Sequence, residues 1–178
     1  MSAAPTAPAA PAHAGRSADA QPPKIREYRS LSLDELRQMS GFELFQRMLA
    51  GELPGAPIAE LMNMWVHEAE PGRVVFAGRP ERKHYNPIGS VHGGYAGTLL
   101  DSCMSCAVQS MLPKGMGYTT LEYKVSLVRA ITDGVGAVYA EGKAIQVGSR
   151  IGTAEGRIVD ANGKLYATGT TTCLIFPI

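Results

Sequence analysis

Large apolar residues are distributed unevenly along the chain, and the first segment contains very few of them. Residues 1–29 consist mainly of Ala, Pro and small polar residues, and no large apolar side chain lies between Met1 and Ile25. Such a segment buries too little apolar surface to offset the conformational entropy lost on ordering. We therefore expect a disordered Ala/Pro-rich tail over residues 1–29 and one folded domain over residues 30–178.

Two short amphipathic helices are expected at the start of this domain. Ser32 and Glu35, and likewise Ser40 and Glu43, have the Ser-x-x-Glu spacing of a capping box, in which each side chain binds the backbone N–H of the other residue. Apolar residues recur at helical spacing after the second box. The pattern predicts a helical extension over residues 30–57.

The middle of the chain predicts a β-hairpin and one long buried helix. Residues 65–70 and 73–77 are β-type segments on either side of a Pro71-Gly72 turn. From Gly93 to about Leu112 the residues are small or apolar on nearly all sides of a helix. A helix of this composition has to be buried on most of its surface.

Four β-type segments separated by turn sequences complete the pattern. They cover residues 118–128, 136–147, 150–159 and 164–176. We expect three successive hairpins, so that these strands form an antiparallel meander. The order of hairpin, buried helix and meander predicts an α+β domain in which the sheet curls around the helix.

Composition and charge narrow the range of functions. The chain of 178 residues is 45% hydrophobic and 19% charged, with a formal net charge of +1. This near-neutral charge gives no basic face for nucleic acid or an anionic membrane. No segment has the apolar length of a membrane span or the pattern of a secretory leader. Three cysteines, an odd number, favour free thiols in a reducing compartment. We expect a cytoplasmic protein that binds neither nucleic acid nor membranes.

The segment HYNPIGSVHGGYAGTLLDSC, residues 84–103, carries the candidate chemistry. It places Gly93 and Gly94 at the helix entrance, where N–H groups lack an intrahelical acceptor and lie at the positive end of the helix dipole. Such a donor can stabilise an oxyanion. Asp101 follows Gly93 by eight residues, a little over two turns, so it returns to the same helix face. A carboxylate is costly to bury among apolar residues, which favours a catalytic role over a satisfied core or interface hydrogen bond.

Several positions in this segment and after it share the spacing of a known enzyme family. The shared positions are His84-x-Asn86-x-x-Gly89-x-x-His92-Gly93-Gly94-x-x-x-Thr98-Leu99-Leu100-Asp101, with Thr120-Leu121-Glu122 and Gly148-Ser149-Arg150 further on. The chain thereby resembles the hotdog-fold acyl-CoA thioesterases of the phenylacetate-degradation type, relatives of the 4-hydroxybenzoyl-CoA thioesterases, over roughly residues 45–178. The resemblance implies a sheet wrapped around one central helix, homodimers that commonly pair into homotetramers, and hydrolysis of coenzyme A thioesters with neither metal nor cofactor.

The resemblance also implies catalytic roles for individual residues. Gly93 would supply the oxyanion donor, and Asp101 would act as nucleophile or as general base toward water, two roles that the sequence does not separate. Asn86 would orient the thioester or the water, unless it only caps its own turn. Ser105, one turn after Asp101, could hold water beside it, and Thr120 matches a hydroxyl that the partner subunit contributes in the family. Either hydroxyl could instead bind backbone.

A second group of residues is expected to bind substrate. His92 and Gly94 would shape the turn, although Gly94 could be present only for close packing. The phosphates of coenzyme A would lie at a group of cations and turn N–H groups, unless the arginines are merely solvated. This group consists of Arg129, Gly148, Ser149 and Arg150.

Alternative functions remain open at this level. A hotdog-fold hydratase or dehydratase would pair His84 or His92 with Asp101, although we expect His84 to be a solvated loop residue. A non-catalytic acyl-CoA-binding protein would use the N-terminal helices to close the site or dock a partner. Cys103 and Cys106 have redox spacing, but their position in mid-helix favours buried core thiols. Phenylacetyl, medium-chain and hydroxybenzoyl groups all remain possible acyl groups.

Overall fold

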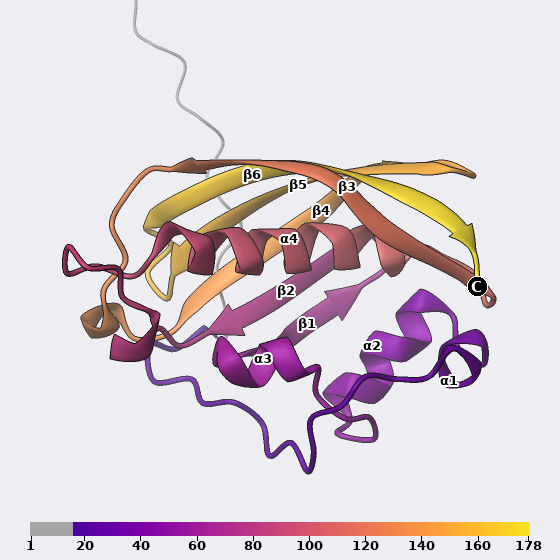
Figure 1. The fold of residues 1–178 in the computed structure, drawn as a ribbon, viewed down its shortest axis with the longest axis horizontal. Helices are drawn as coiled ribbons and strands as arrows, with labels where there is room; N and C mark the ends of the chain where they lie inside the picture. Colours follow the sequence, from indigo (N-terminus) through magenta and orange to yellow (C-terminus); the bar gives the residue numbers. More distant parts are fainter. Residues whose placement is uncertain (1–15) are drawn as a thin grey trace, which may run out of the picture.

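A six-stranded antiparallel sheet curves around one long helix in the computed structural model, which describes residues 16–178 (Figure 1). Helix α4 (Gly93–Gln109) lies in the concave face of this sheet. The predicted α+β hotdog architecture is confirmed. The strands are β1 (Met64–Glu70), β2 (Arg73–Gly78), β3 (Met116–Leu127), β4 (Val138–Val147), β5 (Ile151–Asp160) and β6 (Leu165–Pro177).

Close contact between the sheet and α4 depends on glycines in three neighbouring strands. Gly142, Gly156 and Gly169 pair with one another across β4, β5 and β6. A Cβ atom at Gly142 would lie 2.1 Å from the Cys103 carbonyl oxygen, and one at Gly156 would lie 2.7 Å from the Met104 side chain. The absence of side chains in this row lets the sheet approach the helix backbone. Cys103 and Met104 are fully buried as a result.

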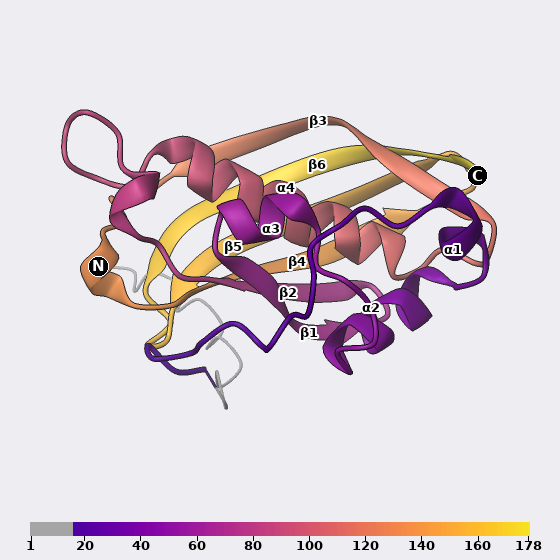
Figure 2. The same cartoon turned by 60° about the horizontal axis from the view of Figure 1, so that its bottom comes forward.

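Helices α1 (Leu33–Arg37) and α2 (Gly41–Leu49) form where the two capping boxes predict them, whereas α3 (Pro57–Leu61) begins without a side-chain cap. The 3-10 turns η1 (Arg82–His84) and η2 (Asp133–Val135) lie later in the chain. Both capping boxes are complete, since the Ser32 and Ser40 side chains accept from the backbone N–H of Glu35 and Glu43 and receive the reciprocal bonds. The extension lies along β1, on the face of the sheet that carries α4 (Figure 2).

The predicted meander is wrong for its first strand. The strand order is β1-β2-β4-β5-β6-β3, so β3 pairs with β6 rather than with β4. Helix α4 carries the chain across the concave face to the far edge of the sheet, and the segment that contains η2 brings it back. Strand β4 therefore pairs with β2 instead of β3, and β3 lies at the edge of the sheet.

The predicted tail over residues 1–29 is too long. Residues 1–15 lie outside the described residues, but residues 16–29 make specific contacts. The Ser17 N–H donates to Tyr139 OH at 2.8 Å, and the Ala137 N–H donates to the Ala18 carbonyl oxygen at 2.8 Å. Tyr28 forms a bridge with Gly55 in the extension. The segment is poor in apolar side chains and is held mainly by backbone and ionic contacts, which composition does not reveal.

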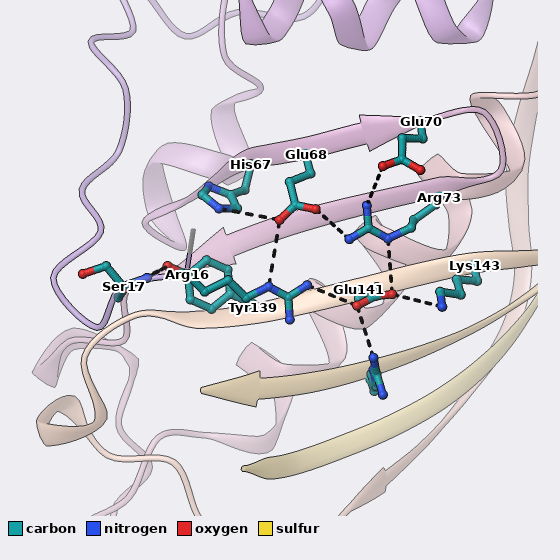
Figure 3. A network of polar contacts seen from close by, with 10 residues as sticks. Arg16, Ser17, His67, Glu68, Glu70, Arg73, Tyr139, Glu141 and Lys143 are labelled. Carbon is teal, nitrogen blue, oxygen red and sulfur yellow. Dashed lines mark hydrogen bonds and ion pairs between the residues drawn. The ribbon is translucent and has the colours of Figure 1, made fainter. Parts of the chain in front are cut away.

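Arg16 anchors this segment to the outer face of the sheet. Its Nη2 lies 3.1 Å from Glu141 Oε2, and its guanidinium stacks over the Tyr139 ring at 5.2 Å (Figure 3). Both Arg16 and Glu141 are nearly fully buried. Arg73 and Arg157 also contact the Glu141 carboxylate, at 3.3 and 3.4 Å. A single buried carboxylate is therefore surrounded by cations from distant parts of the chain.

Candidate active site

The entrance of α4 leaves one backbone donor open. His92 is the N-cap residue, and its Nδ1 accepts a 2.9 Å hydrogen bond from the Gly94 N–H. The Tyr95 N–H donates to the His92 carbonyl oxygen at 2.9 Å, whereas no acceptor among residues 16–178 takes the Gly93 N–H. The Gly93 N–H lies at the positive end of a 17-residue helix and is available to a developing negative charge. This geometry suits the roles expected of Gly93 and His92.

The Asn86 side chain is largely engaged within its own loop. Its Oδ1 accepts from the Ile88 and Ser90 N–H groups at 3.1 and 3.2 Å, and its Nδ2 donates to Ser90 Oγ at 3.1 Å. This is the turn-capping arrangement that the sequence left open. Asn86 lines a small cleft together with His92 and Gly93. The second N–H of Nδ2 is the part of the side chain left to orient a ligand.

Asp101 is held by a hydroxyl from β3. Thr120 Oγ1 donates to Asp101 Oδ1 at 2.9 Å, and Asp101 is half-buried. Since a carboxylate offers two oxygens, Oδ2 can still act on water or on a carbonyl carbon. The resemblance implied that the partner subunit contributes Thr120. In this structure β3 contacts α4 of the same chain, so the bond forms within one subunit.

Ser105 and Tyr118 form a hydrogen-bonded pair near Asp101. Ser105 Oγ lies 3.2 Å from Tyr118 OH, and the Tyr118 hydroxyl also lies 3.9 Å from Cys106 Sγ. Burial raises the pKa of Tyr118 well above its usual range, so this phenol stays protonated. Sequence reasoning did not single out Tyr118, because it is one residue in an ordinary β-type segment and its contact with α4 is tertiary.

Asp101 lies on the wall of a cleft of about 810 Å³ between α4 and the N-terminal extension, which we name the extension cleft. Its walls come from α1, α2, α3, the segment before α1, β1, β2, one face of α4, the start of β3 and the end of β6. The residues of α4 and β3 that line it are Asp101, Ser102, Ser105, Cys106, Gln109, Met116, Gly117, Tyr118, Thr119 and Thr120.

Gly93 and Asp101 lie too far apart to act on one carbonyl group within one chain. Gly93 and Asp101 are separated by eight residues, which corresponds to about 12 Å along the α4 axis. They also line different clefts, since Gly93 lies with Asn86 and His92 whereas Asp101 lies in the extension cleft. The expectation that one helix face would bring both groups together therefore fails, because helical periodicity aligns residues in rotation but not along the axis.

The residues expected to bind coenzyme A are divided in the same way. The Arg129 N–H donates to the Tyr166 carbonyl oxygen, and the Arg150 carbonyl oxygen accepts from the Ile175 N–H. Tyr166 and Ile175 are nine residues apart on β6, about 30 Å along a strand. Arg129 therefore lies at the Gly93 end of the sheet, and the exposed turn of residues 148–150 lies at the Asp101 end.

Comparison with known proteins assigns this architecture to a family. Residues 88–167 match the family model of the thioesterase superfamily, and this range contains the helix entrance, Asp101 and Thr120. This part of the chain is similar to the thioesterase superfamily, in agreement with the fold described above. The resemblance noted from the sequence is confirmed.

Two of the similar proteins are named as an esterase and a thioesterase. A candidate esterase of Halobacterium salinarum is 38% identical over 96 residues, which are 49% of this chain and 62% of that protein, so less than two thirds of its length is matched. A candidate thioesterase from Ralstonia eutropha, described as related to phenylacetic acid degradation, has a TM-score of 0.66 at 27% identity and covers 73% of this chain and 98% of its own. A Thermus thermophilus protein has a TM-score of 0.59 at 28% identity over 66% of this chain and 96% of its own.

His84 and His92, the two histidines considered as partners of Asp101, are not placed to act with it. His84 is buried, contrary to the expected solvated loop residue, because Nδ1 accepts from the Glu81 N–H at 2.9 Å and Nε2 lies 3.1 Å from the Leu61 carbonyl oxygen. Its ring also packs on Tyr95 at 4.7 Å. His92 caps the N-terminal end of α4, nine residues before Asp101.

The cysteines within residues 16–178 are not linked by disulfides. Cys103, Cys106 and Cys173 are free cysteines. Burial raises the pKa of Cys103 well above its usual range and that of the half-buried Cys106 to about 12, which disfavours the thiolate form of both. Residues 16–178 contain no group of three or more His, Cys, Asp or Glu side chains suited to a metal ion, and no helix long and apolar enough to cross a membrane.

Proposed function

We propose that this chain is an acyl-CoA thioesterase that hydrolyses the thioester to a free acid and coenzyme A. The observation that carries the proposal is the Asp101 carboxylate, held at Oδ1 by Thr120 on the wall of a largely apolar cleft. A bound thioester would be attacked at its carbonyl carbon either by Asp101 Oδ2, giving an anhydride that water then opens, or by water that Asp101 deprotonates. The carbonyl oxygen takes up negative charge, and the departing thiolate takes a proton.

The complete site would require two copies of the chain. Strand β3 is an edge of the sheet, and three of its apolar side chains, Leu121, Tyr123 and Leu127, are 55%, 47% and 59% exposed. An uncovered edge strand of this length is a template for pairing with another chain. This exposed edge supports a homodimer in which the β3 strands of two copies lie antiparallel to each other.

This dimer would bring the separated residues together. Thr120 lies beside Asp101, and the Leu127 side chain lies against Gly93. A two-fold axis near Tyr123, midway between Thr120 and Leu127, would place the Asp101 end of one copy next to the Gly93 end of the other. The same rotation would bring Arg129 of one copy toward the turn of residues 148–150 of the other, where phosphates of coenzyme A could bind. Further pairing of dimers into a tetramer remains a prediction.

The placement of the histidines favours hydrolysis over hydration or dehydration. That second reaction would need a histidine base acting with an acid on the central helix. Both ring nitrogens of His84 lie within hydrogen-bond distance of backbone groups, and Nδ1 of His92 is used by the Gly94 N–H. A non-catalytic acyl-CoA-binding protein would have no use for a carboxylate held in this way.

Release of free thiol from acyl-CoA tests the proposal. The chain should release thiol, and Asp101→Asn should lower the rate by about 10² to 10⁴, the usual contribution of a positioned general base. The amide retains the shape of the carboxylate and can still accept from Thr120, so the variant should fold and assemble normally. Glu60→Gln, a charge-neutralising change on an exposed residue of α3, is the control. Intact acyl-CoA after long incubation with wild-type protein, or an Asp101→Asn rate within threefold of wild type, would refute the proposal.

A further inference from the structure

We infer that the extension cleft binds a straight aliphatic acyl group. The protein would then act on medium-chain acyl thioesters rather than on phenylacetyl or hydroxybenzoyl thioesters. The inference rests on the proposed thioesterase function, because it names the acyl group of the same substrate. Most of the residues that line this cleft precede residues 88–167, the range of the family match.

The cleft begins at the proposed catalytic carboxylate. Asp101 lines the cleft, and Ser105 and Gln109 continue the same wall one and two turns further along α4. A carbonyl group positioned at Asp101 would therefore have its acyl substituent directed into this cleft or away from the protein. A volume of about 810 Å³ lies in the usual range for small-molecule sites. This is far more than a two-carbon acyl group would fill.

The length of the cleft along α4 sets a scale for the acyl chain. Asp101 and Gln109 are eight residues apart, so the wall between them extends for about 12 Å. An extended hydrocarbon advances about 1.25 Å per carbon, given C–C bonds of about 1.5 Å. About ten carbons therefore cover the distance from Asp101 to Gln109, which corresponds to acyl groups of about eight to twelve carbons.

The far end of this wall is closed by α2. The Gly41 N–H, at the first residue of α2, donates to the Leu112 carbonyl oxygen at 2.9 Å. A Cβ atom at Gly41 would lie 1.7 Å from the Gln109 carbonyl oxygen, so the backbones of α2 and α4 are in direct contact there. An acyl chain that reached Gln109 would meet this junction and could not continue straight. The contact therefore gives the site an upper limit of chain length.

The facing wall is apolar and adaptable. Helices α1 and α2 and the residues between them contribute several aliphatic, thioether and aromatic side chains to the cleft. These are Leu33, Leu36, Met39, Leu44, Phe45 and Met48. Methionine side chains fit irregular apolar shapes well because they are unbranched and polarisable. A methylene chain buried against this wall gains hydrophobic stabilisation along its whole length.

The polar groups of the cleft are poorly suited to a substituted aromatic acyl group. The hydroxyls of Ser105 and Tyr118 bond one another at 3.2 Å, and the Thr120 hydroxyl is used by Asp101 at 2.9 Å. A phenolic substituent placed beside these three hydroxyls would have to compete with their existing bonds, which is costly in a buried site. The charged side chains that line the cleft are Asp101, at its start, and Arg29, which is bound to Glu35 at 2.8 Å.

A series of acyl-CoA substrates from acetyl to palmitoyl, with phenylacetyl-CoA and 4-hydroxybenzoyl-CoA, tests the inference by thiol release. We expect kcat/KM to rise by up to about fourfold per methylene, the gain from burying one CH₂, and to peak between about eight and twelve carbons. Leu36→Trp should fill the cleft and lower kcat/KM for decanoyl-CoA at least tenfold more than it lowers the value for butanoyl-CoA. Gln38→Trp, an exposed residue next to α1 that does not line the cleft, should change neither value by more than twofold. If Leu36→Trp fails to fold, Leu36→Phe fills the same space less severely.

Binding of the free acid separates this inference from the proposed activity. Calorimetric titration of the full chain with decanoate and with phenylacetate needs no turnover, and we expect decanoate to bind at least tenfold more tightly and Leu36→Trp to remove this preference. Decanoate binding without thiol release from any acyl-CoA would refute the proposed hydrolysis and support the acyl site. A flat chain-length profile, tighter binding of phenylacetate, or a cleft filled by a second copy that excludes decanoate would overturn the inference.

Discussion

Arg16 Nη2 lies 3.1 Å from Glu141 Oε2, although the two residues are 125 positions apart in the sequence. Their side chains are 3% and 4% exposed, so the pair is almost completely removed from water. The contact fastens the N-terminal segment across the outer face of the sheet, opposite the face that carries α4 (Figure 3). It turns a segment of low apolar content into part of the folded domain.

Loss of the Glu141 charge should destabilise the fold. Glu141→Gln leaves the buried Arg16 and the half-buried Arg73 and Arg157 without their shared counter-ion, and breaking one side of a buried ion pair costs about 3 to 5 kcal/mol. Urea unfolding should show this loss in the free energy of unfolding. Arg37→Ala, which removes an exposed pair with Asp34, should cost less than about 1 kcal/mol. Equal effects of the two changes would contradict the structural role of Glu141.

Deletion of residues 1–29 should lower the melting temperature, because it removes Arg16 and the backbone contacts of residues 17 and 18. Deletion of residues 1–15 retains all of these contacts and is the matched control. We expect the longer deletion to melt several degrees below the shorter one, since about 1 kcal/mol shifts the midpoint of a domain of this size by about 2 to 4 °C. Identical melting temperatures would show that the segment adds nothing to stability.

The same carboxylate predicts an acid-sensitive component of stability. Burial alone would raise the pKa of Glu141, but the hydrogen bond from Arg16 and the charges of Arg73 and Arg157 outweigh it and hold the pKa at about 2. A carboxyl group whose pKa is lowered on folding binds more protons in the unfolded state. Its stabilising contribution is therefore complete above the unfolded pKa of about 4.5 and is lost as the pH falls toward 2.

Unfolding experiments between pH 6 and pH 2 check this window. Wild-type protein should lose stability most steeply below about pH 4.5, and Glu141→Gln should show a shallower slope in that range because it has no proton to bind. Both proteins should share the acid sensitivity that comes from their other carboxylates. Parallel slopes for the two proteins would mean that the Glu141 pKa is close to its value in the unfolded chain.

Two substitutions at Gly93 separate the backbone donor from the space around it. Gly93→Pro removes the N–H, and the loss of one oxyanion donor costs about 10² to 10³ in rate. His92 has φ −58° and ψ 138°, a conformation that a residue before proline adopts readily, and proline is favoured at the first helical position. Gly93→Ala keeps the N–H and adds a Cβ that meets the flexible end of Leu127 at 2.8 Å. Alanine should therefore retain most of the thiol release. Similar losses in both variants would assign Gly93 to packing.

A mixing experiment tests the two-copy site. Asp101→Asn and Gly93→Pro homodimers should each be inactive, but dimers that contain one of each chain would have one site with both defects and one intact site. Random exchange of subunits should then restore about a quarter of wild-type turnover, because half of the dimers are mixed and each has one of two sites working. Mixed Asp101→Asn and Asp101→Ala proteins are the control and should stay inactive. No recovery despite proven exchange would place the complete site within one chain.

The sequence was sufficient for the local structure of this protein. Both capping boxes, the hairpin at Pro71-Gly72 and the long buried helix follow from short-range hydrogen bonding, turn preferences and apolar periodicity, which depend on neighbouring residues. The spacing around Gly93 and Asp101 also indicated the family whose model residues 88–167 match, since helix entrance and carboxylate belong to one continuous segment.

Tertiary structure decided the features that depend on distance in space. The pairing of β3 with β6, the docking of Arg16 on Glu141 and the hydrogen bond between Ser105 and Tyr118 join segments whose contact is not encoded in local spacing. The axial separation of about 12 Å between Gly93 and Asp101 follows from the helical rise of about 1.5 Å per residue. Only the tertiary structure shows that the two residues line different clefts. Periodicity determines which face of an element a residue occupies, whereas the packing of whole elements determines which residues can act together.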